Sequence, residues 1–251
     1  MTGAWLAAHY HLTLLDTLLV AGTAFVAGLM RGFSGFGAAL TIAPVLSLVV
    51  GPRAGIPAVL LVMSITSLQL VPGALKHVNW RTVTPLSIGG IVGIPAGAWL
   101  LAVVNQNLMR HSISVIVIVF AVLMFIGWRY RGEVGAWISG LAGAVGGFIS
   151  GAAAAGGPAV IMFLLAGPES AARNRAAVIL YFFFMQAAGV VIYLLNGLMT
   201  LNTVWIALPM IPTIALGTWL GEKMFGKASD NLYRRIALVF LLAIGLSTFF
   251  A

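Results

Sequence analysis

Arg31 and Ser34 lie at the start of a glycine-rich segment that interrupts an otherwise apolar chain. This first break runs from Arg31 to Pro44 and reads R-G-F-S-G-F-G-A-A-L-T-I-A-P. A guanidinium binds anions through its fixed charge and its N–H donors, and a serine hydroxyl adds another donor. We therefore interpret Arg31 as an anion-binding group. The alternative is a guanidinium that snorkels to the membrane interface.

A second glycine-rich break begins 115 residues later, runs from Gly146 to Pro158, and reads G-G-F-I-S-G-A-A-A-A-G-G-P. Backbone this rich in glycine does not hold a continuous helix, and lipid does not tolerate unpaired backbone groups. Such breaks at matching places in two halves indicate the binding site of a transporter. Neither break contains an acidic residue that would neutralise Arg31, which favours a ligand anion as its partner.

A short helix is expected to follow each break, with its first N–H groups unpaired and available to an anion. The residues predicted to bind the anion through backbone or hydroxyl groups are Ser34, Gly35, Phe36, Gly37, Ser150, Gly151, Gly156, Gly157 and Pro158. Gln69 and Gln186 are unusual in apolar helices, and we predict that they line the path of the ligand. The alternatives are close helix crossing for the glycines and interhelical hydrogen bonding for the glutamines.

The composition is that of a membrane protein. Hydrophobic residues make up 61% of the chain, charged residues only 7%, and the mean hydropathy is +1.10. The net charge of +8 comes from basic residues in short loops, which indicates membrane topology rather than nucleic-acid binding. The chain has no cysteine, and its four histidines have no metal-ligand spacing, so we expect no metal and no cofactor. The first residues contain no Lys or Arg, so a cleaved signal peptide is not expected.

Apolar runs divide the chain into candidate membrane helices, of which six are long enough to span, since a span needs about 20 residues. The runs lie at 14–30, 38–50, 54–75, 82–104, 111–128, 135–150, 159–167, 176–196, 203–220 and 232–250. The runs that follow the two breaks, 38–50 and 159–167, are too short to cross. We interpret each as part of a helical hairpin that enters the membrane and turns back.

The basic residues support the hairpin interpretation. With a hairpin at each break, one side of the membrane carries ten basic residues and the other carries only Arg53 and Arg110. The ten are Lys76, Arg81, Arg129, Arg131, Arg173, Arg175, Lys223, Lys227, Arg234 and Arg235. Treating each broken segment as a single crossing weakens this bias to eight against four. The positive-inside rule therefore places both termini in the periplasm, and the second half enters from the opposite side to the first.

The two halves also match in sequence. Gly51-Pro52 corresponds to Gly167-Pro168, Gln69 to Gln186, and Gly97-Ala98-Trp99-Leu100 to Gly217-Thr218-Trp219-Leu220. We predict an all-α polytopic membrane protein with one domain over residues 1–251. Two inverted repeats, at about 12–128 and 133–250, would each contain a broken hairpin and three transmembrane helices, with the site at their interface.

A competing motif is Gly32-Phe33-Ser34-Gly35, which matches the G-x-S-G pattern of intramembrane serine proteases of the rhomboid type. That chemistry requires a histidine base on a neighbouring helix. No histidine falls within a long apolar run after Ser34, so a membrane-embedded serine hydrolase is the least favoured of the functions considered.

At the same two breaks the chain resembles the sulfite exporter TauE/SafE family, also called the toluene sulfonate uptake permease family. The matching segments read G-F-S-G-F-G-A-A-L-T-I-A-P-V-L and G-F-I-S-G-A-A-A-A-G-G-P, followed by the loops Gly51-Pro52-Arg53 and Gly167-Pro168-Glu169. The first copy departs from the family pattern at Phe36 and Ala38, where glycines are usual, and by starting with Arg31. The resemblance implies secondary transport of small sulfur-containing anions across the inner membrane.

Together these observations predict a multi-pass inner-membrane transporter, more specifically an exporter, for sulfite, sulfonates or sulfoacetate, working by alternating access. The expected partners are this small anion and membrane lipid. Coupling to protons or other ions and oligomer formation remain open. A passive anion channel is the alternative function, because it would have a similar sequence.

Overall fold

The computed structural model of the protein describes residues 14–126, 135–154, 156–164, 169 and 171–225, and every regular element in them is a helix. The helices are α2 (Leu14–Ser34), α3 (Ala38–Val50), α4 (Pro52–Ser67), α5 (Val71–Ala74), α6 (Trp80–Val103), α7 (Gln106–Phe125), α8 (Ala136–Ala153), α9 (Gly157–Leu164), α10 (Ala171–Leu195), α11 (Leu201–Ala207) and α12 (Met210–Phe225). The predicted helix at 232–250 and the predicted Gly167-Pro168 loop lie outside the described residues. The all-α prediction is confirmed.

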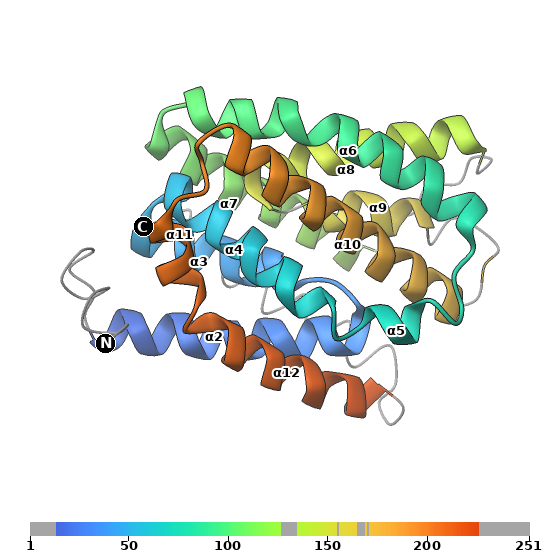
Figure 1. Ribbon diagram of the computed structural model, residues 1–251, viewed down its shortest axis with the longest axis horizontal. Coiled ribbons are helices and arrows are strands. Elements are labelled where there is room, and N and C mark those ends of the chain that lie inside the picture. The colour runs from blue at the N-terminus through green and yellow to red at the C-terminus, as the bar shows by residue number, and fades with distance from the viewer. Residues whose placement is uncertain (1–13, 127–134, 155, 165–168, 170, 226–251) are drawn as a thin grey trace.

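Two closely packed helix pairs form opposite edges of the molecule, α6 with α8 and α2 with α12 (Figure 1). In the first pair, Gly89, Gly93 and Gly97 recur every four positions on α6 and face the backbone of α8. A Cβ atom at Gly93 would overlap the carbonyl oxygen of Ala144. Glycine is needed at these positions because small residues let two helix backbones approach closely in an apolar environment.

The second pair is built in the same way. Gly28 and Gly32 of α2 lie directly against the backbone of α12, and Gly217 and Gly221 of α12 lie against α2. The glycines of the matched segments at Gly97 and Gly217 therefore have the same structural role, each bringing its helix against a helix that ends in a glycine-rich break.

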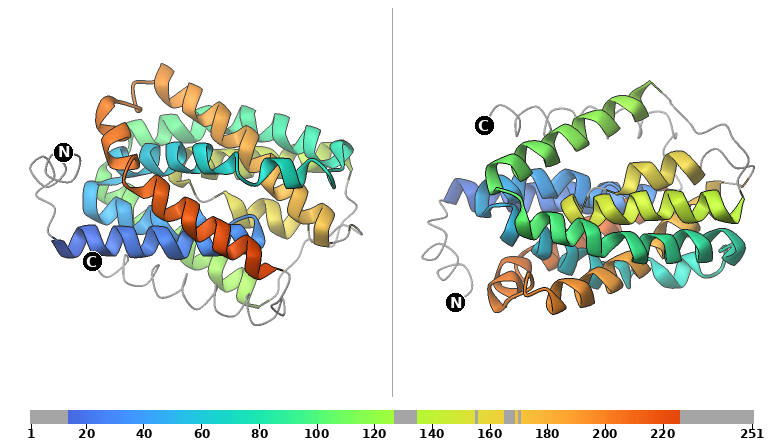
Figure 2. Two further views of the ribbon diagram at one scale, coloured as in Figure 1. Left: turned by 60° about the horizontal axis from the view of Figure 1, so that its bottom comes forward. Right: turned by 90° about the horizontal axis from the view of Figure 1, so that it is seen from above.

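Each break reverses the direction of the chain and forms a hairpin, α2–α3 or α8–α9, whose second helix lies on the inner side of its helix pair (Figure 2). The first reversal uses Gly35 and Gly37, whose φ angles of 83° and 91° favour glycine. In the second, Ala154 ends α8 in the left-handed region at φ 54°. The helices then pack back on one another, since Thr41 of α3 donates to Met30 Sδ of α2 at 3.2 Å.

Two of the predicted apolar runs are interrupted. The run at 54–75 leaves the α-helical form after Ser67, and Gln69 lies in the turn before α5. Hydroxyl groups of Thr66 and Ser67 bond back to carbonyls of α4, a pattern that bends helices, and Pro72 cannot donate an N–H. The run at 203–220 is bent by 44° between α11 and α12, where Pro209 lies.

Four of the described helices are long and apolar enough to cross a membrane: Leu14–Phe33, Trp80–Val103, Ala136–Ala153 and Arg173–Leu195. The bent pair α11 and α12 makes a fifth candidate, and α3 and α4 are shorter apolar helices. Together with the large apolar residues exposed on their surfaces, these helices give a multi-pass membrane protein.

Candidate functional site

A cavity of about 30 Å³ lies where the two breaks meet, in contact with α4 and α10. It is lined by Arg31, Gly35, Phe36, Gly37, Ala38, Ala39, Leu40, Met63, Ala154, Gly157, Phe182 and Gln186. This volume suffices for about two water molecules. The expected meeting of the two glycine breaks is therefore a feature of the tertiary structure, and we call this space the Arg31 cavity.

The guanidinium of Arg31 is buried at this cavity, and the side chain is only 4% exposed. Arg31 lies in the last turn of α2, where the helix dipole favours a cation. Its Nη2 atom donates to the Met63 carbonyl at 3.1 Å, to the Ser67 hydroxyl and to Gln186 Oε1 at 3.4 Å. The alternative of a guanidinium that snorkels to the interface does not describe this buried position.

Other donors of the same guanidinium have poorer partners. Nη1 meets the thioether sulfur of Met63 at 2.7 Å, and a thioether is a weak acceptor. Nε is buried without a hydrogen-bond partner among the residues that the structure describes. Within the described part of the chain, no carboxylate forms an ion pair with Arg31. Among the described residues only neutral groups contact this positive charge, an arrangement that is costly in an apolar interior unless an anion compensates it.

Gln186 of α10 is the second polar side chain at the cavity, and it is 7% exposed. Its Oε1 atom faces Arg31 Nη2 and the Ser67 hydroxyl. A guanidinium has only donors, so the oxygen of the amide must point toward it. Among the described residues the amide nitrogen of Gln186 has no partner. Two N–H donors are therefore left for a ligand.

Backbone at both breaks adds further donor capacity. The first residues of α3, from Ala38 to Leu40, line the cavity, and so does Gly157 at the start of α9. The first N–H groups of a helix have no partner within the helix and carry partial positive charge. The remaining walls are apolar, with the rings of Phe36 and Phe182 as the largest surfaces. The site thus combines one cation, neutral donors and an apolar wall.

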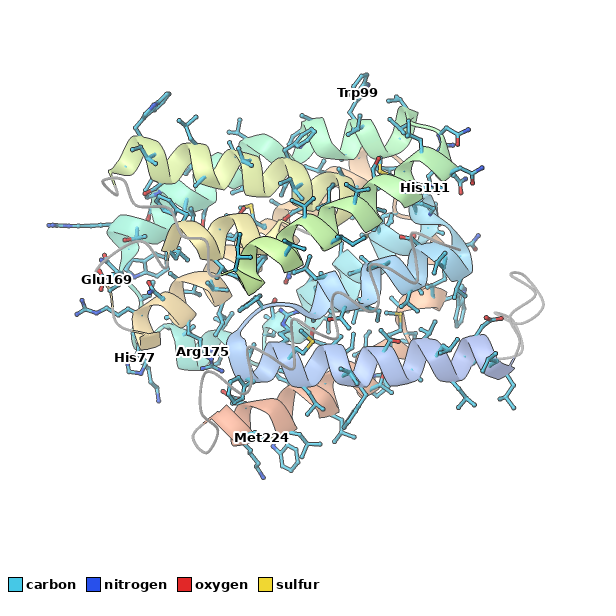
Figure 3. The ribbon with its side chains drawn as sticks, turned by 180° about the vertical axis from the view of Figure 1, so that it is seen from behind. His77, Trp99, His111, Glu169, Arg175 and Met224 are labelled. Carbon is cyan, nitrogen blue, oxygen red and sulfur yellow. The ribbon has the colours of Figure 1, made fainter. Side chains whose placement is uncertain are left out.

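Helix α10 passes both breaks and connects them to the Arg31 cavity. Near its start, Arg175 Nη2 donates to the carbonyl of Gly32 at 2.9 Å, which satisfies an acceptor in the last turn of α2 (Figure 3). Ile179 lies beside Gly35, and Phe182 beside Gly157. One turn further, Gln186 reaches Arg31. Residues of α10 therefore contact both breaks and fix their positions relative to each other.

The predicted site residues divide into three groups. Arg31, Gly35, Phe36, Gly37, Gly157 and Gln186 are brought together at the cavity. Ser150, Gly151, Gly156 and Gln69 do not line it. The side chains of Ser34 and Pro158 lie outside those that the structure describes.

Of the residues that do not line the cavity, the two glycines have packing roles. Gly151 is pressed against α6 and accepts a hydrogen bond from Tyr193, and Gly156 lies against the Gly146 carbonyl and the Ser150 hydroxyl within the second hairpin. Gln69 is exposed and donates to the Ala215 carbonyl at 3.3 Å. Close packing, the alternative reading of the glycines, thus describes Gly151 and Gly156.

Sequence reasoning did not single out Met63, Ser67, Ala154 or Phe182. Met63 and Ser67 lie four positions apart on α4, as do Phe182 and Gln186 on α10, so each pair occupies one helix face. That spacing is the only local signal, and it is common in buried helices. Ala154 carries no signal, because an alanine in a left-handed conformation is recognised only from the backbone.

One polar cluster outside the cavity is centred on Glu169, just before α10. Glu169 accepts hydrogen bonds from Arg173 at 3.0 Å and from Asn79 at 2.7 Å, and these bonds lower the pKa of its carboxyl below the ordinary value. No group of three or more His, Cys, Asp or Glu side chains that would hold a metal is found among the described residues.

No curated protein and no solved structure matches the chain. The family model described as Sulfite exporter TauE/SafE matches residues 20–248, nearly the whole chain, and confirms the resemblance carried by the two breaks. That family consists of membrane transporters and not of enzymes, so the serine hydrolase alternative is set aside. With this match over both breaks and the helices around them, the chain belongs to the sulfite exporter TauE/SafE family.

Proposed function

We propose that the protein is a secondary transporter that exports small organosulfur anions across the inner membrane by alternating access around the two breaks. One observation carries the proposal. Arg31 is buried at a cavity that both breaks line, and no carboxylate among the described residues pairs with it. An anion bound there would compensate the guanidinium charge and would meet the N–H groups at the starts of α3 and α9.

Alternating access is supported by the arrangement of the helix pairs. The first hairpin begins with α2, which packs against α12, and the second begins with α8, which packs against α6. Each hairpin therefore packs against a glycine-lined helix from the other predicted repeat, as inverted repeats would require. An anion of five heavy atoms needs a wider space than the cavity described. A movement of one hairpin relative to the other would provide it.

The distribution of polar residues supports the proposed orientation. His77, Glu169 and Arg175 lie toward one end of the molecule, whereas Trp99 and His111 lie toward the opposite end (Figure 3). The first end also contains Arg173, which pairs with Glu169. By the positive-inside rule this is the cytoplasmic end, and both termini are then periplasmic.

The proposal is tested by flux measurements in proteoliposomes with sulfite, methanesulfonate and toluenesulfonate. We expect saturable flux that responds to an imposed ion gradient. Arg31→Gln should reduce it about 100-fold or more, because the variant removes the buried charge that the anion pairs with. Arg31→Lys keeps the charge but loses the planar arrangement of donors, and should be intermediate.

Arg53→Gln is the matched control. Arg53 is exposed, donates to the Ala102 carbonyl at 2.7 Å and does not line the cavity. Its replacement should leave flux unchanged. Wild-type flux from Arg31→Gln would refute the anion site. Flux that does not saturate and ignores an imposed proton gradient would favour a passive anion channel.

A further inference from the structure

The described residues that line the Arg31 cavity carry a single formal charge. Among its described lining residues, Arg31 is the one charged side chain, and Gln186 is the other side chain with polar atoms suited to bind an anion. The remaining lining residues are glycines, alanines, Phe36, Leu40, Met63 and Phe182. The number of charges on the ligand is therefore constrained by the site itself.

We propose that this site selects singly charged anions over doubly charged ones, and that Gln186 is the residue that sets this charge preference. The inference rests on the proposed transport function and narrows its substrate class. A sulfonate with one charge and an apolar substituent would match the charge of the site once the hairpin movement has widened the cavity, whereas sulfate, the sulfite dianion and sulfoacetate would be discriminated against.

The physical reason is charge balance in an apolar space. One negative charge is neutralised by the buried guanidinium, and the ligand's apolar substituent can contact the Phe36 and Phe182 rings. A second negative charge would meet only neutral dipoles, and an unpaired charge in such surroundings is strongly unfavourable. The dianion would therefore lose more hydration free energy than its interactions with the site would restore.

Gln186 sets the charge balance between the site and its ligand because its side chain lies next to Arg31. Its oxygen is already directed at Arg31 and Ser67, the side chain lines the cavity, and its amide nitrogen has no partner among the described residues. The side chain therefore offers an anion neutral donors but no charge. A cationic side chain at position 186 would make the site doubly positive. An anionic side chain at the same position would neutralise Arg31 directly.

Three compounds of similar shape and different charge test the proposal: dimethyl sulfone, which is neutral, methanesulfonate with one negative charge, and sulfate with two. Dissociation constants would be measured by titration calorimetry on the detergent-purified full-length protein. For the wild type we expect methanesulfonate to bind, with sulfate and dimethyl sulfone each at least about tenfold weaker.

Two substitutions at Gln186 give opposite expectations. Gln186→Lys adds a cation and should shift the affinity ratio toward sulfate by at least about tenfold. Gln186→Glu has the same size and should pair with Arg31, so methanesulfonate binding should fall at least about tenfold. Gln106→Lys and Gln106→Glu are the matched controls. Gln106 is exposed at the start of α7 and does not line the cavity, so neither control should change the affinity ratio.

The outcomes separate the two proposals. Equal binding of sulfate and methanesulfonate to the wild type would overturn the charge selectivity and leave the transport proposal standing. Undiminished methanesulfonate binding by Gln186→Glu would also overturn the role of Gln186. Failure of both anions to bind the wild type would instead contradict the anion site on which the transport proposal depends.

Discussion

The first break turns the chain with Gly35 and Gly37, whereas the second ends α8 at Ala154, an alanine held in the left-handed region at φ 54°. Arg31, the first residue of the first break and part of the last turn of α2, contributes the charge of the cavity. In the second, Gly156 and Ser150 pack inside the hairpin, and the Ser150 hydroxyl is buried without a partner among the described residues. The two similar hairpins thus have different roles at the cavity. The first supplies its charge, and the second forms part of its wall through close backbone packing.

This difference shows how a duplicated scaffold can hold an asymmetric site. Both hairpins start with a helix that packs through glycines, and both bring the start of a short helix to the cavity. Only near the first break does a cation lie at the cavity, where α4 and α10 hold it through Met63, Ser67 and Gln186. We therefore expect substitutions in the two hairpins to separate into effects on binding and effects on folding.

The largest effect on folding should come from the second hairpin. A Cβ atom at Gly156 would overlap the Gly146 carbonyl and approach the Ser150 hydroxyl, so Gly156→Ala should lower stability by about 3 kcal/mol or more. At the first break, Gly37→Ala meets only the flexible Met30 side chain at 3.2 Å but strains a backbone with φ 91°, and should cost about 1–2 kcal/mol. Thermal unfolding in detergent measures both.

Gly73→Ala is the control for this pair, because nothing lies within 4 Å of the added Cβ and the residue is in helix α5. It should be neutral or slightly stabilising. If Gly156→Ala and Gly37→Ala lowered the unfolding temperature equally, the second hairpin would not be the more tightly packed one.

An intermediate effect on stability is expected where a side chain of α10 donates a hydrogen bond to the backbone of each hairpin. Arg175→Gln removes the donor to the Gly32 carbonyl near Arg31, and should cost about 1–3 kcal/mol and weaken anion binding, with partial recovery in Arg175→Lys. Tyr193→Phe removes the donor to the Gly151 carbonyl and should cost about 1 kcal/mol.

Anion binding distinguishes these two variants, because only Arg175 supports the helix that carries the cation. Calorimetry with methanesulfonate should therefore show a change for Arg175→Gln and none for Tyr193→Phe. Weaker binding in both variants would mean that the two hairpins share the binding function.

The smallest expected effect is a gain in stability. Ala154 is in a conformation that glycine adopts without penalty, so Ala154→Gly should raise stability by about 1 kcal/mol. The added freedom of glycine in the unfolded chain offsets part of this gain. A lower unfolding temperature for Ala154→Gly would show that the methyl group packs in the cavity wall strongly enough to outweigh the backbone strain.

Much of the fold follows from local sequence patterns. The helices α3 and α6 lie almost where the apolar runs predict them, and the chain reverses at the glycine segments. The apolar pattern does not predict the interruption after Ser67. Hydroxyl groups that donate to carbonyls one turn earlier, and a following proline, weaken a helix without breaking its apolar pattern. Gln69 is consequently exposed, although its sequence counterpart Gln186 is buried.

The sequence by itself determined that the chain is an apolar helical membrane protein with two glycine breaks and a cation near only the first. These properties depend on composition and local conformational preference, which neighbouring residues in the chain settle. Only the tertiary structure decided that Arg31 is buried among Met63, Ser67 and Gln186, and that Gly157 lines the same cavity whereas Gly151 and Gly156 pack against backbone. The contacts of Arg31 join residues more than 30 positions apart, and their geometry depends on how whole helices pack.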